Sequence, residues 1–436
     1  MSSRTEQRKT SGHRQRRASS IQNILHAHWQ EFARESPQPQ YVHRAAYLLA
    51  HCRTAVLGGH VVCCEHGHVA EVYYNSCRHR CCPACSSVPR ANWLARWQAK
   101  MLNTPAHHIV FTVPQELVAL WRMNKKGFTD ALFTAAKDSL LTLLADPQFL
   151  GAEPGLLGAL HTWSQALAAH PHCHFIVTSG GLASDGSWRT AKKQCLLPRK
   201  VLMIMFRGKL LAKLRELVSS SPVRLPENWT EARYLSLLNR LGRATWNVKL
   251  LERYAHAEGV AIYLAKYLRG GPISNQRLLR VQAGQVTFGY LDRRDGKVPI
   301  QAKCTLPVAN FLKLWSQHVP PAGMHTVRAY GLYASGSTKR LNVVRQLLKQ
   351  TPYDAQQFAA DQKSKQVFEA LQDANALAAI PSASTCTTCG KKLERCRVRF
   401  PAARPWQVMQ TARPAELGTI SQRPPPEICF VDGTAA

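Results

Sequence analysis

A block of seven cysteines between Cys52 and Cys85 is the feature that most constrains how this chain can fold. Within the block, two residues separate Cys63 from His66, and two residues separate Cys82 from Cys85. Two such pairs, about fifteen residues apart, place four soft ligands within tetrahedral reach, which is how structural zinc is held. Four protein ligands leave no position open for water, so we expect the site to fold a small module rather than to catalyse a reaction.

The choice of ligands within this block is open at the level of the sequence. The predicted zinc ligands are Cys63, His66, Cys82 and Cys85, with Cys77 as the alternate. Cys64 and Cys81 offer further thiols, so the spacing does not select a single set of four. A cluster of free thiols without a metal is the alternative interpretation of the same residues.

The charge of the chain predicts a polyanionic partner. Its 57 Lys and Arg residues against 26 Asp and Glu residues give a net charge of +31, far more than solubility requires. Nucleic acid is the first candidate for this partner, and an anionic membrane surface is the second. Within the cysteine block, Arg78 and Arg80 are therefore predicted to contact DNA phosphates.

We expect neither a secretory signal nor a membrane helix from the first residues of the sequence. Residues 1–20 contain six Lys or Arg and one Glu, without an apolar core, and are predicted to form a disordered basic arm. No apolar run in the sequence approaches the roughly twenty residues that a membrane helix needs. We therefore expect a cytoplasmic protein without membrane contact, whose cysteines stay reduced or bind metal rather than form disulfides.

Helical periodicity and short β-branched runs alternate along the chain, which predicts mixed α and β structure. After the basic arm we expect a helical and zinc-binding DNA-binding module over residues 21–100 and a larger mixed domain over 104–335. Residues 336–436 are expected to form a partly disordered C-terminal extension. Within it Cys386 and Cys389 have the spacing of a metal-binding pair, and their role is left open.

Two histidines, His172 and His174, stand at the head of an apolar run that is predicted to be a strand. Residues two apart point to the same side of a strand, so both imidazoles would project from one face of a sheet. Gln165, on the preceding predicted strand, could face the same side and complete a set of two nitrogens and one oxygen. Such an incomplete set suits Mg²⁺ or Mn²⁺ with positions open for phosphate oxygens. Ordinary strand residues and structural zinc ligands are the alternatives.

Tyr263 and Tyr267 are candidates for a nucleophile. They are four residues apart in a helical pattern, so both hydroxyls could reach one site from the same helical face. A phenol has a pKa near 10, and a nearby cation such as Lys266 would ease its attack on a phosphate. An aromatic pair at this spacing is also typical of core packing.

Two segments of the sequence, "HTWSQALAAHPHCHFIVTSGGL" and "YLAKYLRGGPISNQRL", resemble signature blocks of a known family. The family is that of the HUH-tyrosine transposases of the insertion-sequence-ninety-one type, including their common-region relatives. The segments "CRTAVLGGHV", "FTVPQEL" and "HVPPAGMHTVRAYGLYA" resemble the same family in the same order. The resemblance therefore spans roughly residues 40 to 335.

This resemblance implies an α+β fold, an HUH endonuclease core with a central antiparallel sheet flanked by helices and preceded by a small zinc-binding module. It implies that a tyrosine cuts single-stranded DNA at the element's end, forming a 5′-phosphotyrosine and freeing a 3′-hydroxyl before rolling-circle-like strand transfer. Tyr263 and Tyr267 would be the nucleophiles, and His172 and His174 the metal ligands. Gln165 matches the position where related nickases place a third, polar ligand.

Two positions depart from the family pattern. His66 stands where a second cysteine is usual, and Cys173 stands between the two histidines where a bulky apolar residue is usual. The chain has no GxxxxGK[ST] motif, so strand separation would depend on host replication or a host helicase. A plasmid or phage replication initiator with the same chemistry remains an alternative, as does a non-catalytic zinc-dependent DNA-binding protein. In either case we expect a bacterial, nucleoid-associated protein.

Overall fold

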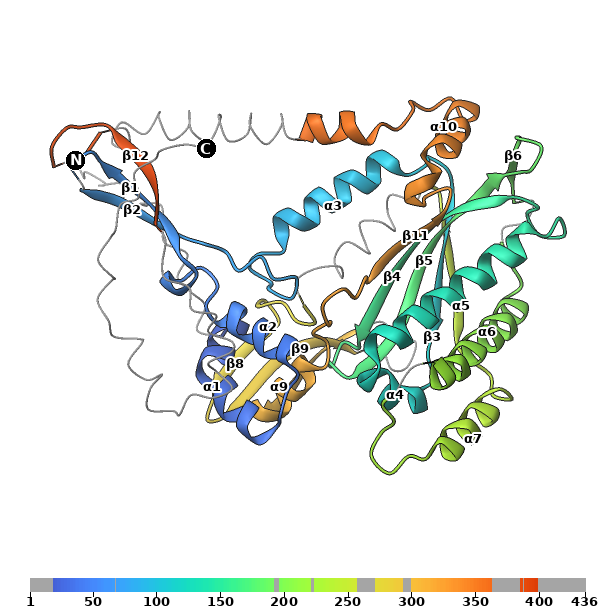
Figure 1. The fold of residues 1–436 in the computed structure, drawn as a ribbon, viewed down its shortest axis with the longest axis horizontal. Coiled ribbons are helices and arrows are strands. Elements are labelled where there is room, and N and C mark those ends of the chain that lie inside the picture. Colours follow the sequence, from blue (N-terminus) through green and yellow to red (C-terminus); the bar gives the residue numbers. More distant parts are fainter. Residues whose placement is uncertain are drawn as a thin grey trace, which may run out of the picture.

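The computed structural model describes residues 19–66, 68–191, 196–220, 223–256, 271–292, 299–362, 385–386 and 388–398. Within these ranges the chain forms one antiparallel sheet of six strands and two smaller sheets of three strands each (Figure 1). Helices flank the large sheet, so the predicted α+β class with a central antiparallel sheet is confirmed. None of the helices in the described ranges is both long and apolar enough to cross a membrane.

The central sheet is built from strands that are distant in the sequence. In spatial order it contains β11 (Val327–Gly331), β4 (Glu153–Trp163), β5 (Ala169–Leu182), β3 (Ala106–Thr112) and β7 (Val248–Tyr254), with β6 (Trp188–Thr190) paired to β5. Each pair of neighbours is antiparallel. The two longest strands, β4 and β5, are consecutive in the chain and form a hairpin at the centre of the sheet.

One face of the central sheet is covered by four helices (Figure 1). These are α4 (Val118–Met123), α5 (Lys125–Ala145), α6 (Arg199–Ser220) and α7 (Glu231–Leu241). From β5, the side chains of Cys173, Phe175 and Val177 enter this core and are fully buried. Because side chains alternate along a strand, His172 and His174 belong to the opposite face.

The opposite face of the sheet packs partly against α3 (Ser87–Lys100) and α10 (Thr338–Leu347). Leu157 and Ile176 of the sheet lie in this second core. Trp93 and Trp97 of α3 have ring centroids 6.0 Å apart and pack against the same core, as expected for an aromatic stripe at helical spacing. The described part of the chain also contains three short 3₁₀ helices: η1 (Ala55–Leu57), η2 (Gln115–Leu117) and η3 (Ser335–Ser337).

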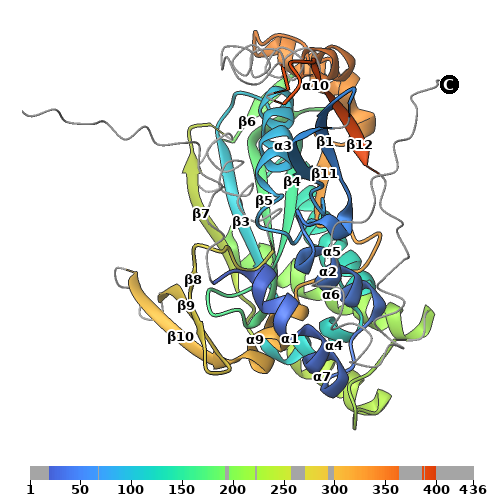
Figure 2. The same cartoon turned by 90° about the vertical axis from the view of Figure 1, so that its left-hand side faces the viewer.

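A separate hydrophobic core joins the N-terminal helices to a small sheet. It contains α1 (Ile21–Glu35), α2 (Gln40–Ala50), α9 (Val308–Ser316) and the sheet of β8 (Leu278–Gln282), β9 (Gln285–Asp292) and β10 (Ile300–Pro307). Helix α1 begins where the Ser20 hydroxyl accepts a hydrogen bond from the Asn23 backbone N–H. Both views place this unit at the opposite end of the molecule from α10 (Figures 1 and 2).

The third sheet joins the two ends of the described chain. The hairpin of β1 (Gly59–Cys64) and β2 (Val69–Tyr74) is extended by β12 (Leu393–Val398), in the order β12, β1, β2. Strand β12 runs antiparallel to β1, from Gly59 opposite Val398 to Cys64 opposite Leu393. Nothing in the sequence predicted this pairing.

Candidate metal centres

Three histidines converge on the face of the central sheet that α5 and α6 leave uncovered. The register of the β4–β5 hairpin pairs His161 directly with His172, and His174 lies two residues further along β5. One ring nitrogen from each residue lies within 4.8 Å of those of the other two. The side chains of His161 and His174 are buried. The hairpin thus presents three imidazole nitrogens at one point.

The orientation of two of these rings is fixed by hydrogen bonds at Nδ1. In His172, Nδ1–H donates to the backbone carbonyl of His170 at 2.6 Å. In His174, Nδ1 lies 2.7 Å from Nε2 of His108 on β3. Metal-binding histidines are typically held in this way through one nitrogen while the other binds the metal. In both rings the nitrogen left for a metal is Nε2.

Burial keeps these rings neutral at physiological pH. It lowers the pKa of His172 and of His108 to about 4, and it lowers the pKa of His161 and His174 as well, with the neighbouring histidines adding to the effect. A neutral imidazole is the form that binds a metal ion. Three such donors fit a divalent transition metal and leave positions for oxygen ligands, whereas Mg²⁺ prefers carboxylate and water.

Gln165 does not belong to this cluster, and His161 takes the place predicted for it. Strand β4 ends at Trp163, and Gln165 lies in the turn that Ala168 closes through a backbone hydrogen bond of 2.9 Å to Ser164. The Gln165 side chain is exposed, and its backbone carbonyl accepts a hydrogen bond from Arg277. A regular count back from this turn would put Leu160 opposite His172, but an irregularity between His161 and Trp163 shifts the register and puts His161 there.

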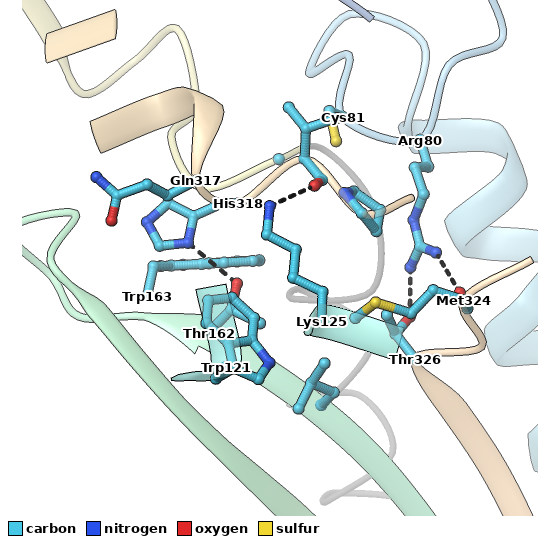
Figure 3. A pocket seen from close by; sticks show the side chains of 14 residues that line it. Arg80, Cys81, Trp121, Lys125, Thr162, Trp163, Gln317, His318, Met324 and Thr326 are labelled. Atoms are coloured by element: carbon cyan, nitrogen blue, oxygen red, sulfur yellow. Dashed lines mark hydrogen bonds between the residues drawn. The ribbon is translucent and has the colours of Figure 1, made fainter. Parts of the chain in front are cut away.

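His318 braces the end of the strand that carries His161. Its Nδ1 accepts a hydrogen bond of 3.1 Å from the Thr162 hydroxyl (Figure 3), and its Nε2–H donates to the Leu167 carbonyl at 2.9 Å. Acceptance of a hydrogen bond at Nδ1 requires the neutral ring, and burial lowers the pKa of His318 to about 4. The β4–β5 turn is therefore anchored to the segment that follows α9.

Arg80 lines a pocket that His318 and Thr162 also line, and its side chain is engaged within the protein rather than directed to solvent. Its guanidinium donates to the Met324 carbonyl at 3.5 Å and to the Thr326 hydroxyl (Figure 3). It thereby ties the cysteine block to the segment before β11, which argues against the predicted phosphate contact. Arg78, by contrast, is exposed, and its predicted contact with DNA stays a prediction.

A set of four cysteines gathers at the base of the β1–β2 hairpin. Its members are Cys52, Cys77, Cys82 and Cys85. The Sγ atoms of Cys52 and Cys85 are 3.2 Å apart, those of Cys52 and Cys82 are 3.7 Å apart, and those of Cys77 and Cys85 are 3.8 Å apart. A tetrahedral zinc ion with Zn–S bonds near 2.3 Å separates its sulfurs by about 3.8 Å. The four thiols fit such a site.

The hairpin explains why this set differs from the predicted one. Arg53 N–H bonds to the Asn75 carbonyl at 3.0 Å, so the residues that flank the hairpin, Cys52 and Cys77, come together at its base. His66 lies at the tip of the hairpin, where its side chain is exposed and its Nε2 lies 3.8 Å from Glu65 Oε1. Cys63 lies on β1, and its side chain falls outside the described residues. Cys82 and Cys85 thus lie together with Cys77, the predicted alternate, and with Cys52, which was not predicted.

The predicted nucleophiles fall outside the described residues. Tyr263, Tyr267 and Lys266 all lie in residues 257–270, which the structure does not describe. Their predicted roles in cleavage and phosphate binding stay predictions.

Two family models match the chain in the regions that hold these clusters. One, described as "Transposase zinc-binding domain", matches residues 24–113, which contain the four-cysteine set. The other, described as "Putative transposase", matches residues 155–341, which contain the three histidines. The fold and its metal-binding clusters thus correspond to a transposase with an N-terminal zinc-binding module.

Named relatives agree with this class. The chain is 38% identical over 288 residues to "Putative transposase y4qJ" of Sinorhizobium fredii, which covers 64% of this chain and 71% of the relative. It is 31% identical over 289 residues to the transposase of insertion sequence element IS801 of Pseudomonas savastanoi pv. phaseolicola. This match covers 65% of this chain and 68% of the relative. The chain belongs to the family of IS91-type transposases.

Solved structures with partial likeness are complexes of the conjugative relaxase TrwC with oriT DNA. One aligns at 13% identity with a TM-score of 0.21, covering 37% of this chain and 68% of that chain. Another, with a 27-mer DNA comprising the recognition hairpin and the cleavage site, aligns at 12% identity with a TM-score of 0.21. It covers 37% of this chain and 71% of that chain. The family assignment rests on the sequence matches alone.

Proposed function

We propose that this transposase is an HUH-type endonuclease that nicks and rejoins single-stranded DNA at the ends of its element and mobilises it by a rolling-circle-like route. The observation that carries the proposal is the convergence of His161, His172 and His174 on one face of the central sheet. Three neutral imidazoles with room for further ligands suit a metal that also binds phosphate oxygens.

Cleavage proceeds by attack of a tyrosine oxygen, from Tyr263 or Tyr267, on the scissile phosphorus. The bond from phosphorus to the 3′-oxygen breaks, the 3′-hydroxyl leaves with a proton, and the DNA remains linked through a 5′-phosphotyrosine. A second attack by a 3′-hydroxyl reverses these steps and joins new ends, so no ATP is needed. A divalent metal, when bound, would draw electron density from the phosphate, and the donor set favours Mn²⁺ over Mg²⁺.

The protein's own groups provide orientation and charge. His108 and the His170 carbonyl hold two of the ligand rings, and the sheet beneath them is fully packed. The net charge of +31 supplies the attraction to DNA phosphates, and exposed Arg78 lies next to the four-cysteine set. We propose structural zinc for Cys52, Cys77, Cys82 and Cys85, and action in the cytoplasm with strand separation by host replication or a host helicase.

The test is a cleavage assay on labelled single-stranded oligonucleotides that carry candidate element ends. With Mn²⁺ we expect a covalent protein–DNA adduct that survives denaturing electrophoresis, and with EDTA we expect none. The adduct should also vanish in H172A and in the Y263F/Y267F double variant. Metal-independent DNA binding with no adduct in any condition would instead identify a non-catalytic DNA-binding protein.

A further inference from the structure

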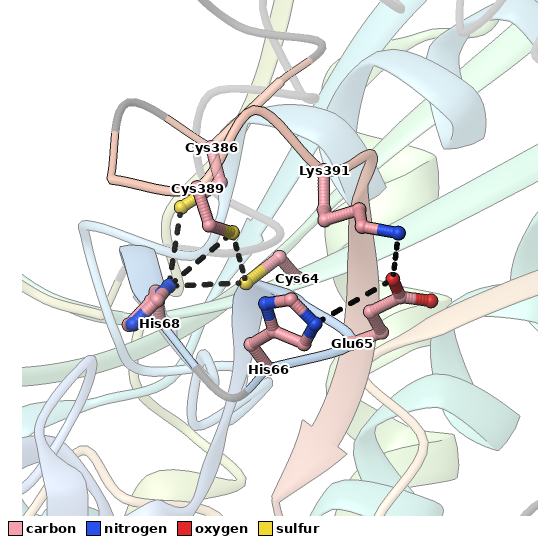
Figure 4. Close-up of polar contacts among 7 residues, drawn as sticks. All are labelled: Cys64, Glu65, His66, His68, Cys386, Cys389 and Lys391. Carbon is pink, nitrogen blue, oxygen red and sulfur yellow. Dashed lines mark hydrogen bonds and ion pairs between the residues drawn. The ribbon is translucent and has the colours of Figure 1, made fainter.

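A second set of four potential ligands lies at the tip of the β1–β2 hairpin, away from the set at its base. It consists of Cys64, His68, Cys386 and Cys389. Two of these residues flank the hairpin turn, and the other two come from the C-terminal part of the chain (Figure 4). The family models end at residues 113 and 341, so neither of them reaches the C-terminal pair.

The distances within this set are those of a tetrahedral metal site. Nδ1 of His68 lies 3.5 Å from Sγ of Cys64, 3.6 Å from that of Cys386 and 3.4 Å from that of Cys389. The sulfurs of Cys64 and Cys389 are 3.5 Å apart. Zinc bound by three thiolates and an imidazole requires nitrogen–sulfur separations of about 3.6 Å and sulfur–sulfur separations of about 3.8 Å.

The backbone around the C-terminal pair folds as a tight turn that presents both thiols on one side. The Cys386 N–H donates to the Lys391 carbonyl at 2.7 Å, and the Gly390 N–H donates to the Cys386 carbonyl at 2.8 Å. Gly390 adopts a φ of 68°, a conformation that favours glycine. The backbone N–H groups of Thr388 and Cys389 donate hydrogen bonds to the Cys386 thiol and would stabilise it as a metal-bound thiolate.

Further contacts join the two halves of this set. Lys391 Nζ lies 2.8 Å from Glu65 Oε1 across the cluster (Figure 4). Immediately beyond, β12 pairs with β1 along its whole length. A hairpin edge and a short isolated strand are marginal in water without such support.

We propose that Cys64, His68, Cys386 and Cys389 bind a second structural zinc ion, which fastens the C-terminal segment to the N-terminal hairpin. Three thiolates and one imidazole form a closed, soft ligand set without a position for substrate. The zinc thereby makes the C-terminal strand β12 a permanent part of the N-terminal zinc-binding module. The proposal is independent of the cleavage chemistry, because no residue of this set belongs to the histidine cluster.

The test compares zinc content, by elemental mass spectrometry, among full-length proteins dialysed against the same EDTA-free buffer. The C386S/C389S variant should hold one zinc equivalent less than the wild type. C304S, which changes a thiol outside every cluster of the described residues, should hold as much as the wild type. Equal zinc in C386S/C389S and the wild type would overturn the proposal.

A second pair of variants separates loss of a ligand from misfolding. H68A should lose the same single equivalent, whereas H68C should keep it, because four thiolates also bind zinc tetrahedrally. In the cobalt-substituted protein, H68C should shift the visible absorption bands relative to the wild type, since the ligand set changes from three sulfurs to four. Unchanged zinc in H68A, or an unchanged cobalt spectrum in H68C, would show that His68 is not a ligand.

Discussion

Two β-hairpins each carry a cluster of potential metal ligands: the four-cysteine set lies at the base of β1–β2, and the histidine cluster lies on β4–β5. The two clusters differ in the number and type of their ligands. The first takes its ligands from the residues that flank a hairpin and from a tight turn, and it closes around four sulfurs. The second takes them from facing positions within paired strands and offers three nitrogens. The number and softness of the donors, rather than the hairpin, separate a structural site from one that can bind a substrate.

The surroundings of the two clusters differ as well. The cysteines link the short β1–β2 hairpin to the core of α1, α2 and α9, and Cys77 and Cys85 only partly enter that core. The histidines stand on a sheet whose other face is packed by four helices. Loss of metal should therefore unfold the first region and leave the second folded, and the predictions below test this difference.

The largest effect is expected at the cysteine set. In small zinc modules folding is coupled to zinc binding, whose apparent free energy is about 10–16 kcal/mol. C82S/C85S should therefore lose one zinc equivalent and the ordered structure around it. Limited proteolysis should then cut within residues 52–85, which the wild type should protect. C304S is the matched control, and a protease-resistant C82S/C85S protein would contradict a structural role for these thiols.

The next effect concerns catalysis without unfolding. H172A should lower adduct formation by at least about 100-fold, since a lost metal ligand removes several kcal/mol of charge stabilisation. Its zinc content and melting temperature should stay near those of the wild type. If H172A instead lost zinc and melted early, the histidine cluster would be a structural site like the cysteines.

A smaller effect is expected at His108, which positions His174. H108A should weaken Mn²⁺ affinity and adduct formation by about 10 to 100-fold, the usual cost of removing a partner of a metal-binding histidine. H108Q should recover part of this loss, because its amide oxygen can accept the hydrogen bond from Nδ1–H of His174. Equal losses in both variants would mean that His108 acts only by packing.

The pH dependence of stability should reveal His318. Its pKa is about 4 in the folded state against 6.5 when exposed, so its contribution is complete above pH 6.5 and is lost as the pH falls towards 4. The free energy of unfolding from urea titrations should fall by up to about 3 kcal/mol over this range. H318Q should show a shallower fall, although the other buried histidines act in the same direction. If the free energy of unfolding fell equally steeply with pH in H318Q and the wild type, His318 would not contribute to the pH dependence of stability.

The smallest effect is expected at Gln165, the third ligand predicted from the sequence, in comparison with His161, which the structure places beside His172 and His174. Q165A should change adduct formation by less than about twofold, since exposed turn residues contribute little to a site they do not contact. H161A should lower it as strongly as H172A does. A large loss in Q165A with none in H161A would restore the set predicted from the sequence.

Much of the fold was predictable because its patterns are local. The alternation along β5, with Cys173 and Phe175 in the core, indicates a strand and puts His172 and His174 on one face. Hairpin register is harder, because it depends on where the turn closes. His161, rather than Gln165, lies beside His172 because the turn spans residues 164–168 and an irregularity between His161 and Trp163 shifts the register.

The four-cysteine set overlaps the predicted zinc ligands only in part, for a related reason: Cys82, Cys85 and the alternate Cys77 belong to it, but Cys52 was not predicted. Spacing within the block favours close pairs such as Cys63 and His66, whereas the β1–β2 hairpin separates its tip from its base and joins Cys52 to Cys77. The link from Cys64 to Cys389 spans 325 residues, and no local pattern contains it. Residues 336–436 also lack the periodicity that would have predicted β12.

The position of β12 has a consequence for the order in which the protein is made. Synthesis completes every described strand of the central sheet at β11, before the ribosome reaches Cys386. Until then the outer edge of β1 presents unpaired backbone groups, a surface that invites association with other chains. A product truncated between β11 and β12 would thus carry its histidine cluster but an unfinished N-terminal module, and only a chain that extends through β12 would close the hairpin edge.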